Sequence, residues 1–381
     1  MITPVVVLGA TGSIGTQTLE VADSLGIPVV ALVSRRPSEE LGELARRYPD
    51  AEVIVAGGPS DEREGLTTAI GRAVRHGSDP ILEAAATPGR VVVNGIVGAA
   101  GLRATIAALE AGNRVALANK ESLVAGGPVV TAALNANKGE LIPVDSEHSA
   151  LYQCLKGEPA DGVARLILTA SGGPFRGRSR DSLADVTAEQ ALRHPTWSMG
   201  RRITIDSATM FNKGLEIIET HHLFGVEYER IGVVIHPQSI LHSAVEFVDG
   251  SWKGHLGYPD MRIPIQYALT APGRMPGPGE PFSLVGLDLT FEEPDRNAFP
   301  ALDIAFAAGK AGGSAPAVMN AADEMAVEAF LHGRLGFLGI ADVVERAIAD
   351  VEWRELRTVE DVVEVDAEAR SVAAGLIAGV C

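Results

Sequence analysis

The sequence predicts an α/β protein with three successive parts. A doubly wound parallel sheet comes first, a central α+β region with an open sheet follows, and a helical bundle ends the chain. Three features predict this order. Short, fully apolar runs alternate with helical stretches in the first third of the chain. Polar and apolar residues alternate in the middle, as in 243–248, and helical periodicity dominates beyond about Pro300.

Continuous apolar runs in the first part indicate strands that are buried on both faces, as in a parallel sheet covered by helices. We expect this domain to span residues 1–145 and to bind a ligand at its strand-to-helix turns. The expected strands are residues 5–8, 29–33, 53–55, 91–93, 115–117 and 141–144.

The central domain is expected at residues 146–275, with a helix from Ala208 to about Phe224. Prolines and glycines after Ala271 cannot sustain helix or sheet, and we place a linker at 276–299. The strands expected in the central domain are residues 166–169, 203–205, 233–235 and 243–248.

The C-terminal domain, residues 300–381, is expected to be helical. One helix should run from Ala317 to Leu331 and stop at Gly333, a plausible C-cap. A second should begin after Thr358, where Thr358 and Asp361 have the spacing of a capping box. We interpret this domain as a structural support without catalytic residues.

Composition restricts the possible partners. The chain has 381 residues and a formal net charge of −17, which argues against nucleic acid, because phosphate backbones need clustered Lys and Arg. Two cysteines without a CxxC pair predict neither a disulfide framework nor a thiolate metal site. No apolar stretch reaches roughly 18 residues and no targeting signal is recognisable, so we expect no membrane span and a cytoplasmic location.

A glycine-rich turn lies between the first expected strand and the first expected helix. Gly9, Gly12 and Gly15 have a G-x-x-G-x-x-G spacing, a variant of the dinucleotide fingerprint. Glycine lets the backbone approach a pyrophosphate, and N–H groups at the helix N-terminus bind the anion. The sequence therefore predicts a dinucleotide site here, against the alternative of a tight turn without a ligand.

The residues that follow the second expected strand select between the two nicotinamide dinucleotides. A protein that binds NAD usually has Asp or Glu there, to accept hydrogen bonds from the ribose 2′-hydroxyl. This chain has Arg35 and Arg36, which can neutralise a 2′-phosphate. We therefore predict that the chain binds NADP in preference to NAD. The alternative is that one of the two arginines is simply solvated.

Two carboxylates, Asp145 and Glu147, follow the expected strand 141–144. At i and i+2 in extended backbone they would point to one side and could converge on a hard cation such as Mg²⁺ or Mn²⁺. Glu216 is the candidate third ligand, and it shares a helix face with Asn212 at i, i+4. A structural role for the two carboxylates is the alternative, and the sequence does not show that Glu216 meets Asp145.

Because the chain is acidic, a phosphorylated substrate has to be held by local donors. Such donors occur at Ser171, before two glycines, at Ser207, and at Asn212 and Lys213. Hydroxyl, amide and ammonium groups together can bind a dianion. The alternative is that each is a turn or cap residue, and Ser207 in particular could N-cap a helix at an expected strand-to-helix junction.

Residues 194–200 are expected to form an exposed loop that contains Trp197 and Met199. Large apolar residues on a loop need a physical reason. A lid that closes over the substrate and excludes water is one such reason. Packing of Trp197 into the surface of its own domain is the other.

Side by side, these segments resemble the 1-deoxy-D-xylulose 5-phosphate reductoisomerase family from end to end. Their joint occurrence in this order is more specific than any single motif. The segments that carry the resemblance are residues 9–15, 118–122, 143–150, 171–175, 194–200, 206–210, 212–216, 236–239 and 257–261.

The resemblance implies an enzyme that rearranges the small sugar phosphate 1-deoxy-D-xylulose 5-phosphate. It then reduces the branched aldehyde with NADPH to 2-C-methyl-D-erythritol 4-phosphate, an early step of the non-mevalonate route to isoprenoid precursors. It also implies one divalent cation, Mg²⁺ or Mn²⁺, per active site and a homodimer.

The resemblance further implies roles for individual residues, with Met199 in the closing loop. The metal ligands would be Asp145, Glu147 and Glu216. Catalytic roles would fall to Lys120, Glu147 and His194. Substrate contacts would come from Lys120, Ser146, Glu147, Ser171, His194, Trp197, Ser207, Asn212, Lys213 and Glu216. NADPH contacts would come from Thr11, Gly12, Ser13, Ile14, Arg35, Arg36, Asn119, Glu121 and Gly200.

Some points stay open at this stage. The family pattern has Gly, a basic residue and a small polar residue where this chain has Arg35-Arg36-Pro37, so Arg36 alone keeps the basic role. The proton-transfer group is open among Lys120, His194 and a metal-bound water.

Three other functions fit parts of the sequence. A metal-independent NADP-dependent dehydrogenase is disfavoured by the Asp145–Glu147 and Asn212–Glu216 segments. A non-catalytic NADP sensor or scaffold would need neither a metal site nor a lid. A catalytically idle homologue is the third, although every residue needed for the chemistry is present.

Overall fold

The structure is a computed structural model that describes residues 3–96, 101–197 and 199–379. The chain divides into two compact units, each made of several segments. The first comprises residues 1–122, 130–149 and 260–281, and the second comprises residues 123–129, 150–259 and 282–381. Ser198 of the predicted loop and Cys381 lie outside the described residues.

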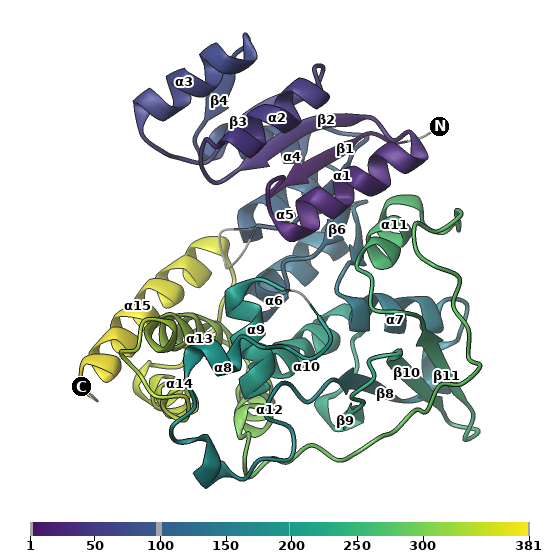
Figure 1. Ribbon diagram of the computed structural model, residues 1–381, viewed down its shortest axis with the longest axis vertical. Helices are drawn as coiled ribbons and strands as arrows, with labels where there is room; N and C mark the ends of the chain where they lie inside the picture. Colours follow the sequence, from purple (N-terminus) through teal and green to yellow (C-terminus); the bar gives the residue numbers. More distant parts are fainter. Residues whose placement is uncertain (1–2, 97–100, 198, 380–381) are drawn as a thin grey trace. The chain divides into compact units, whose positions relative to one another are not determined.

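A seven-stranded parallel sheet forms the centre of the first unit, with helices on both faces (Figure 1). In the strand order β4-β3-β2-β1-β5-β6-β7, strands β2 to β4 lie on one side of β1 and strands β5 to β7 on the other, as in a doubly wound sheet. This confirms the predicted fold class, and β4 is a strand that the sequence did not predict. The strands are β1 (Val5–Leu8), β2 (Val29–Ser34), β3 (Glu52–Val55), β4 (Val74–His76), β5 (Val91–Asn94), β6 (Arg114–Leu117) and β7 (Glu140–Pro143).

The helices of this unit follow the strands in alternation, because each parallel crossover needs a connecting helix. One helix arrives from much later in the chain: α11 (Arg262–Thr270) packs against α1. The others are α1 (Ser13–Leu25), α2 (Glu39–Arg47), α3 (Ser60–Ile70), α4 (Ser78–Ala86), α5 (Leu102–Glu110), α6 (Glu121–Ala136, bent at Gly126) and the start of α7 (Ser146–Leu155).

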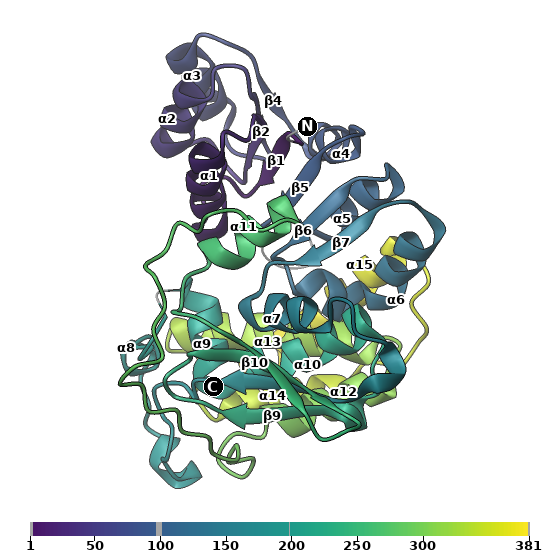
Figure 2. The same ribbon diagram turned by 90° about the vertical axis from the view of Figure 1, so that its right-hand side faces the viewer.

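A four-stranded mixed sheet lies in the second unit, in the order β11-β10-β8-β9. Strands β8 and β9 pair in parallel, whereas β10 is antiparallel to β8 and to β11. Figure 2 shows α10, α12 and α13 behind this sheet, and α10 contacts β8 and β9. The strands are β8 (Val163–Ala170), β9 (Ile231–Ile235), β10 (Leu241–Phe247) and β11 (Trp252–Leu256).

The predicted strand 203–205 is wrong. These residues lie inside helix α9 (Arg201–Thr209), where the Thr204 hydroxyl donates to the Gly200 carbonyl over 2.8 Å. Two β-branched isoleucines around a threonine favour a strand locally, but so short a run does not distinguish strand from helix. Burial of Ile205 within the helical layer decides the outcome.

Helices α9 and α10 (Phe211–Phe224) meet at Met210, whose φ is +70°. A left-handed residue breaks the helical hydrogen-bond ladder, so the helix expected from Ala208 begins instead at Phe211. The break gives α9 and α10 separate axes, and each carries polar residues singled out in the sequence.

Residues 300–381, which belong to the second unit, are mainly helical, as predicted, and the short helix α8 lies earlier in the same unit. Helix α13 packs against α14 and α15 and is buried along most of its length. Thr358 and Asp361 form the predicted capping box at the start of α15. In the described ranges, none of the helices has the length and apolar character that crossing a membrane requires. These helices are α8 (Ala188–Ala191), α12 (Ala301–Ala311), α13 (Ala315–Leu331), α14 (Gly339–Asp350) and α15 (Val359–Ala378).

The capping box gives a first prediction. Thr358→Ala removes the oxygen that accepts the Asp361 N–H over 3.1 Å, and we expect a loss of about 1 kcal/mol in the free energy of unfolding. Urea denaturation followed by circular dichroism measures this loss. Ser371→Ala, an exposed hydroxyl in the interior of the same helix, is the control. Equal stability of the two variants would contradict the prediction.

Candidate active site

Only glycine fits at one position of the turn after β1 and at one position in the first turn of α1. Gly9 has φ +88°, and a Cβ there would stand 2.9 Å from the Gly95 carbonyl oxygen. A Cβ on Gly15 would stand 2.2 Å from the Gly9 carbonyl oxygen, closer than any real contact. The helix starts at Ser13 with Gly12 as its N-cap, so Thr11 to Ile14 present a helix N-terminus at the carboxyl end of a central strand.

Arg35 and Arg36 follow β2 beside this turn and are exposed. Within the described ranges, neither guanidinium forms an ion pair. Thr11 and Ser34 share a hydrogen bond of 3.0 Å between their hydroxyls, which joins the turn to the end of β2. The two arginines are therefore available to an anionic ligand at this end of the sheet.

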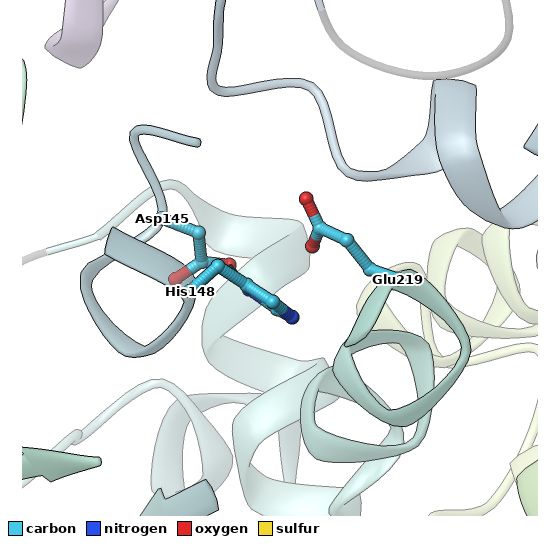
Figure 3. Close-up of side chains that lie close together, drawn as sticks. All are labelled: Asp145, His148 and Glu219. Carbon is cyan, nitrogen blue, oxygen red and sulfur yellow. Dashed lines mark ion pairs between the residues drawn. The ribbon is translucent and has the colours of Figure 1, made fainter. Parts of the chain in front are cut away.

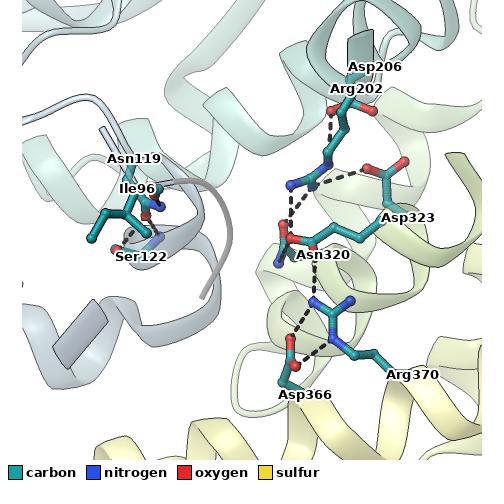
Figure 4. A network of polar contacts seen from close by, with 10 residues as sticks. Ile96, Asn119, Ser122, Arg202, Asp206, Asn320, Asp323, Asp366 and Arg370 are labelled. Atoms are coloured by element: carbon teal, nitrogen blue, oxygen red, sulfur yellow. Dashed lines mark hydrogen bonds and ion pairs between the residues drawn. The ribbon is translucent and has the colours of Figure 1, made fainter. Parts of the chain in front are cut away.

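Asn119 organises the loop after β6 (Figure 4). Its side-chain Oδ1 accepts from the Ser122 N–H over 2.7 Å, and its side-chain Nδ2 donates to the Ile96 carbonyl. The amide thus ties the ends of β5 and β6 together at the same edge of the sheet. Glu121 begins α6 and is half-buried.

Asp145 and Glu147 do not lie in extended backbone, contrary to expectation. Strand β7 ends at Pro143 and α7 begins at Ser146, so both carboxylates lie at the start of a helix. The Asp145 carbonyl accepts from the Ser149 N–H over 2.8 Å, as an N-terminal helical residue does. Asp, Ser and Glu favour a helix start, which the strand-like residues before them concealed.

Asp145 is held by basic groups of its own unit. It pairs with Lys120, which is buried, and His148 Nδ1 lies 3.9 Å from the carboxylate (Figure 3). Burial raises the pKa of Asp145, but Lys120 and His148 outweigh burial and hold this pKa well below its usual range. Ser146 donates to Glu147 Oε2 over 2.7 Å. The sequence analysis did not single out His148, which lies one turn of α7 beyond Asp145.

In the second unit, His194 lies between two serines that the sequence singled out. Its Nε2 is 3.1 Å from both the Ser171 hydroxyl and the Ser207 hydroxyl. Ser207 lies in the last turns of α9 rather than at a strand-to-helix junction, so it does not act as an N-cap. Gly173 (φ +67°) lets the Ser171 turn approach α9, since a Cβ there would stand 2.8 Å from the Ser207 carbonyl oxygen.

The protonation state of His194 follows from its contacts. The N–H groups of Thr196 and Trp197 donate to Nδ1 over 3.2 and 2.9 Å, so this nitrogen is an acceptor. The ring proton therefore lies on Nε2, which faces the two serines. Burial lowers the pKa of His194, which keeps the imidazole neutral near pH 7.

Helix α10 carries the third group of predicted residues. Asn212 donates to Glu216 Oε1 over 2.7 Å, and Lys213 forms an ion pair with Glu216 Oε2. Glu216 and Lys213 are both buried. Glu219, one turn further along the helix and also drawn in Figure 3, is a second buried carboxylate that sequence reasoning missed. Its spacing of three residues from Glu216 was the available signal.

Trp197 is half-buried, and its ring centroid lies 6.3 Å from that of His242 on β10. Packing of Trp197 against its own unit, one of the two alternatives above, is therefore present in this structure. Met199 is half-buried, and Gly200, which is exposed, caps the N-terminus of α9. No sequence signal pointed to His242, whose contact with Trp197 depends on the sheet.

These features define a class of protein before any comparison. A doubly wound sheet with a glycine-only turn binds a dinucleotide. The donor cluster of Ser171, His194 and Ser207 suits an anion, and the carboxylates of Asp145, Glu147 and Glu216 are oxygen ligands of the kind that a divalent cation takes.

Comparison with known proteins gives the family. Residues 5–127 match 1-deoxy-D-xylulose 5-phosphate reductoisomerase, and residues 141–224 and 256–372 match two C-terminal domains of the same enzyme. The enzyme of Desulforamulus reducens is 47% identical, over 99% of this chain and 99% of its own length. The chain belongs to the 1-deoxy-D-xylulose 5-phosphate reductoisomerase family and is an NADP-dependent oxidoreductase.

Solved structures agree along the whole chain. The reductoisomerase of Zymomonas mobilis in complex with NADPH is 43% identical, covers 99% of both chains and has a TM-score of 0.92. A reductoisomerase in complex with NADPH, fosmidomycin and magnesium is 36% identical, covers 98% of both chains and has a TM-score of 0.90.

The neutral His194 gives a second prediction. A histidine whose pKa is lowered on folding stabilises the protein above its ordinary pKa of about 6.5, and this contribution is lost as the pH falls below it. His194→Gln cannot titrate, so its free energy of unfolding should fall less than that of the wild type as the medium is acidified. Urea denaturation across this pH range measures the difference, and identical pH dependences would refute it.

Proposed function

We propose that the residues described above carry out the reaction of the family in this chain. The chain converts 1-deoxy-D-xylulose 5-phosphate to 2-C-methyl-D-erythritol 4-phosphate in the non-mevalonate route to isoprenoid precursors. The reaction depends on NADPH and on one divalent cation, Mg²⁺ or Mn²⁺. The observation that carries the assignment is full-length similarity to reductoisomerases, and each unit by itself presents donors of the required kind.

NADPH binds at the carboxyl edge of the parallel sheet. Gly12, Ser13 and Ile14 receive the pyrophosphate at the N-terminus of α1, where the first N–H groups of the helix have no partner within the helix. Arg35 and Arg36 neutralise the 2′-phosphate, which accounts for the preference for NADP. The further contacts to the cofactor come from Thr11, Asn119, Glu121 and Gly200.

The divalent cation binds Asp145, Glu147 and Glu216. The donor set fits a hard cation, because carboxylate oxygens are the ligands that Mg²⁺ and Mn²⁺ prefer. Asp145 pairs with Lys120 and Glu216 with Lys213, so both carboxylates are already placed to offer an oxygen to a positively charged partner. When bound, the cation polarises the carbonyl of the substrate, and NADPH supplies the hydride.

The phosphate of the substrate binds to donors of the second unit. The Ser171 and Ser207 hydroxyls each lie 3.1 Å from Nε2 of His194. Asn212 and Lys213 add an amide and an ammonium from α10. Because His194 is neutral, it serves the phosphate as a hydrogen-bond donor.

The remaining residues position the sugar and shield it. Ser146 and Lys120 contact the polar backbone of the substrate, and Lys120 is the catalytic residue that can exchange a proton with its oxygens. Trp197 and Met199 close over the substrate and exclude water. The N–H groups of Thr196 and Trp197 hold His194, so closure of this loop and orientation of the imidazole are linked.

The chain is proposed to act as a cytoplasmic homodimer. Strand β11 forms one edge of the four-stranded sheet and carries Trp252, which is 53% exposed. An exposed edge with a large apolar side chain is suited to a contact with a second subunit. Light scattering that gives the mass of a single chain would contradict the dimer.

The glycine turn gives a third prediction. Gly15→Ala places a Cβ against the Gly9 carbonyl, and we expect a loss of NADPH affinity on the order of 10-fold or more, because the turn has to move. Fluorescence titration with NADPH measures the affinity. Gly65→Ala in α3, where a Cβ would meet nothing within 4 Å, is the control. Wild-type affinity in Gly15→Ala would refute the proposed pyrophosphate site.

The metal site gives a fourth prediction. NADPH oxidation with 1-deoxy-D-xylulose 5-phosphate should require Mg²⁺ or Mn²⁺ and stop with EDTA.

Glu216→Gln should reduce this turnover by a factor of about 10² or more while NADPH affinity is kept, because a ligand of the cation is lost. Glu229→Gln, an exposed carboxylate, is the control. Turnover at the wild-type rate in Glu216→Gln would remove Glu216 from the metal ligands.

The same assay separates this function from its alternatives. A metal-independent dehydrogenase would keep its activity in EDTA. A sensor or scaffold would bind NADPH without oxidising it in the presence of substrate. Either result would overturn the proposed reaction.

A further inference from the structure

Helix α9 is joined to helix α13 by a buried polar network inside the second unit (Figure 4). Arg202 on α9 is its centre. The guanidinium donates to Glu324 Oε1 over 2.8 Å and to Asn320 Oδ1 over 3.2 Å. It also lies 3.5 Å from Asp323 Oδ2 and 3.6 Å from Asp206 Oδ2, one turn along its own helix.

A second arginine extends the network to α15. Arg370 contacts the other oxygen of Glu324 and pairs with Asp366 over 2.7 Å. Glu324 is therefore shared between two guanidinium groups, one from α9 and one from α15. Through this carboxylate, α13 is joined to both α9 and α15.

The network is too buried to be a set of ordinary surface ion pairs. Asp323 and Asn320 are 0% exposed and Asp206 is 2% exposed. Carboxylates outnumber guanidinium groups in it, and burial raises the pKa of Asp323 to about 6 even though Arg202 lowers it. Burying charged groups costs free energy unless each has well-placed hydrogen-bond or ion-pair partners. The network therefore favours a single arrangement of its helices.

Helix α9 leads from this network to the proposed phosphate site. Arg202 lies in its first turn, two residues after Gly200, which ends the loop with Trp197 and Met199. Ser207 lies in its last turns, 3.1 Å from His194 Nε2. The Ser171 turn rests on the same helix through Gly173. Any displacement of α9 therefore moves the Ser207 hydroxyl and the surface on which the Ser171 turn packs.

We propose that Arg202 is a positioning residue: by joining α9 to α13 it sets the place of the Ser207 hydroxyl and so controls affinity for the phosphate of the substrate. The C-terminal helices then take part in substrate binding without touching the substrate. This inference rests on the proposed phosphate site, and it assigns a functional role to a region that the sequence suggested was support alone.

The test uses Arg202→Lys first, because an ammonium keeps the buried charge but cannot reach Glu324 and Asn320 together as the planar guanidinium does. We expect the KM for 1-deoxy-D-xylulose 5-phosphate to rise on the order of 10-fold, with kcat reduced far less and NADPH affinity unchanged. Arg202→Met combined with Asp323→Asn removes both charges and should have a larger effect. Arg346→Lys, an exposed arginine of α14, is the control.

A phosphate-free substrate distinguishes positioning from general damage. If Arg202 acts through the phosphate site, its substitution should leave kcat/KM for 1-deoxy-D-xylulose unchanged relative to the wild type. In a Ser207→Ala background, Arg202→Lys should raise the KM for the phosphorylated substrate no further. An equal loss of kcat/KM for both substrates, or fully additive effects with Ser207→Ala, would overturn the inference.

The outcome also separates this inference from the proposal on which it rests. A wild-type KM in Ser207→Ala would show that the phosphate site is assigned wrongly. A raised KM in Ser207→Ala with a wild-type KM in both Arg202 variants would keep the phosphate site and remove Arg202 from it.

Discussion

Buried carboxylates set the main physical constraint on this protein, because a charge removed from water has to be matched by a partner. The two units meet the constraint separately. In the first, Lys120 and His148 face Asp145, and in the second, Lys213 and Asn212 face Glu216. The polar network of α9 and α13 repeats the pattern with Arg202 and buried Asp323. Asp145, Glu216 and Asp323 thus each have a basic partner within their own unit.

The same clusters connect local backbone geometry to function. Gly9 and Gly15 let the backbone at the start of α1 pack closely against the residues after β1 and β5, and Gly173 allows the Ser171 turn to approach α9. Met210, in a left-handed conformation, separates α9, which carries Ser207, from α10, which carries Asn212 and Lys213. At these positions the backbone adopts a conformation, or approaches another segment so closely, that most residues would not fit. Helix ends and turns can therefore lie next to one another there.

The sequence analysis assigned the wrong secondary structure to two short segments, in which only a few residues indicate helix or strand. Residues 203–205 favour a strand by composition and become helical because α9 packs in a helical layer. Asp145 and Glu147 follow an apolar strand, yet they start a helix, since acidic and hydroxyl residues satisfy free N–H groups there. Long periodic segments such as α13, and a capping box such as that of α15, were predictable because many residues agree on one structure.

The sequence by itself determined the parallel sheet, the glycine turn, the paired arginines and the polar residues that suit metal and phosphate. Composition, periodicity and motif spacing are local properties, and they carry this information directly. Tertiary structure decided which side chains meet. It placed His194 between Ser171 and Ser207, returned α11 to the first unit, and joined Arg202 to Glu324 across more than a hundred residues of sequence. Contacts of that kind depend on how helices pack, and packing is a property of the whole fold.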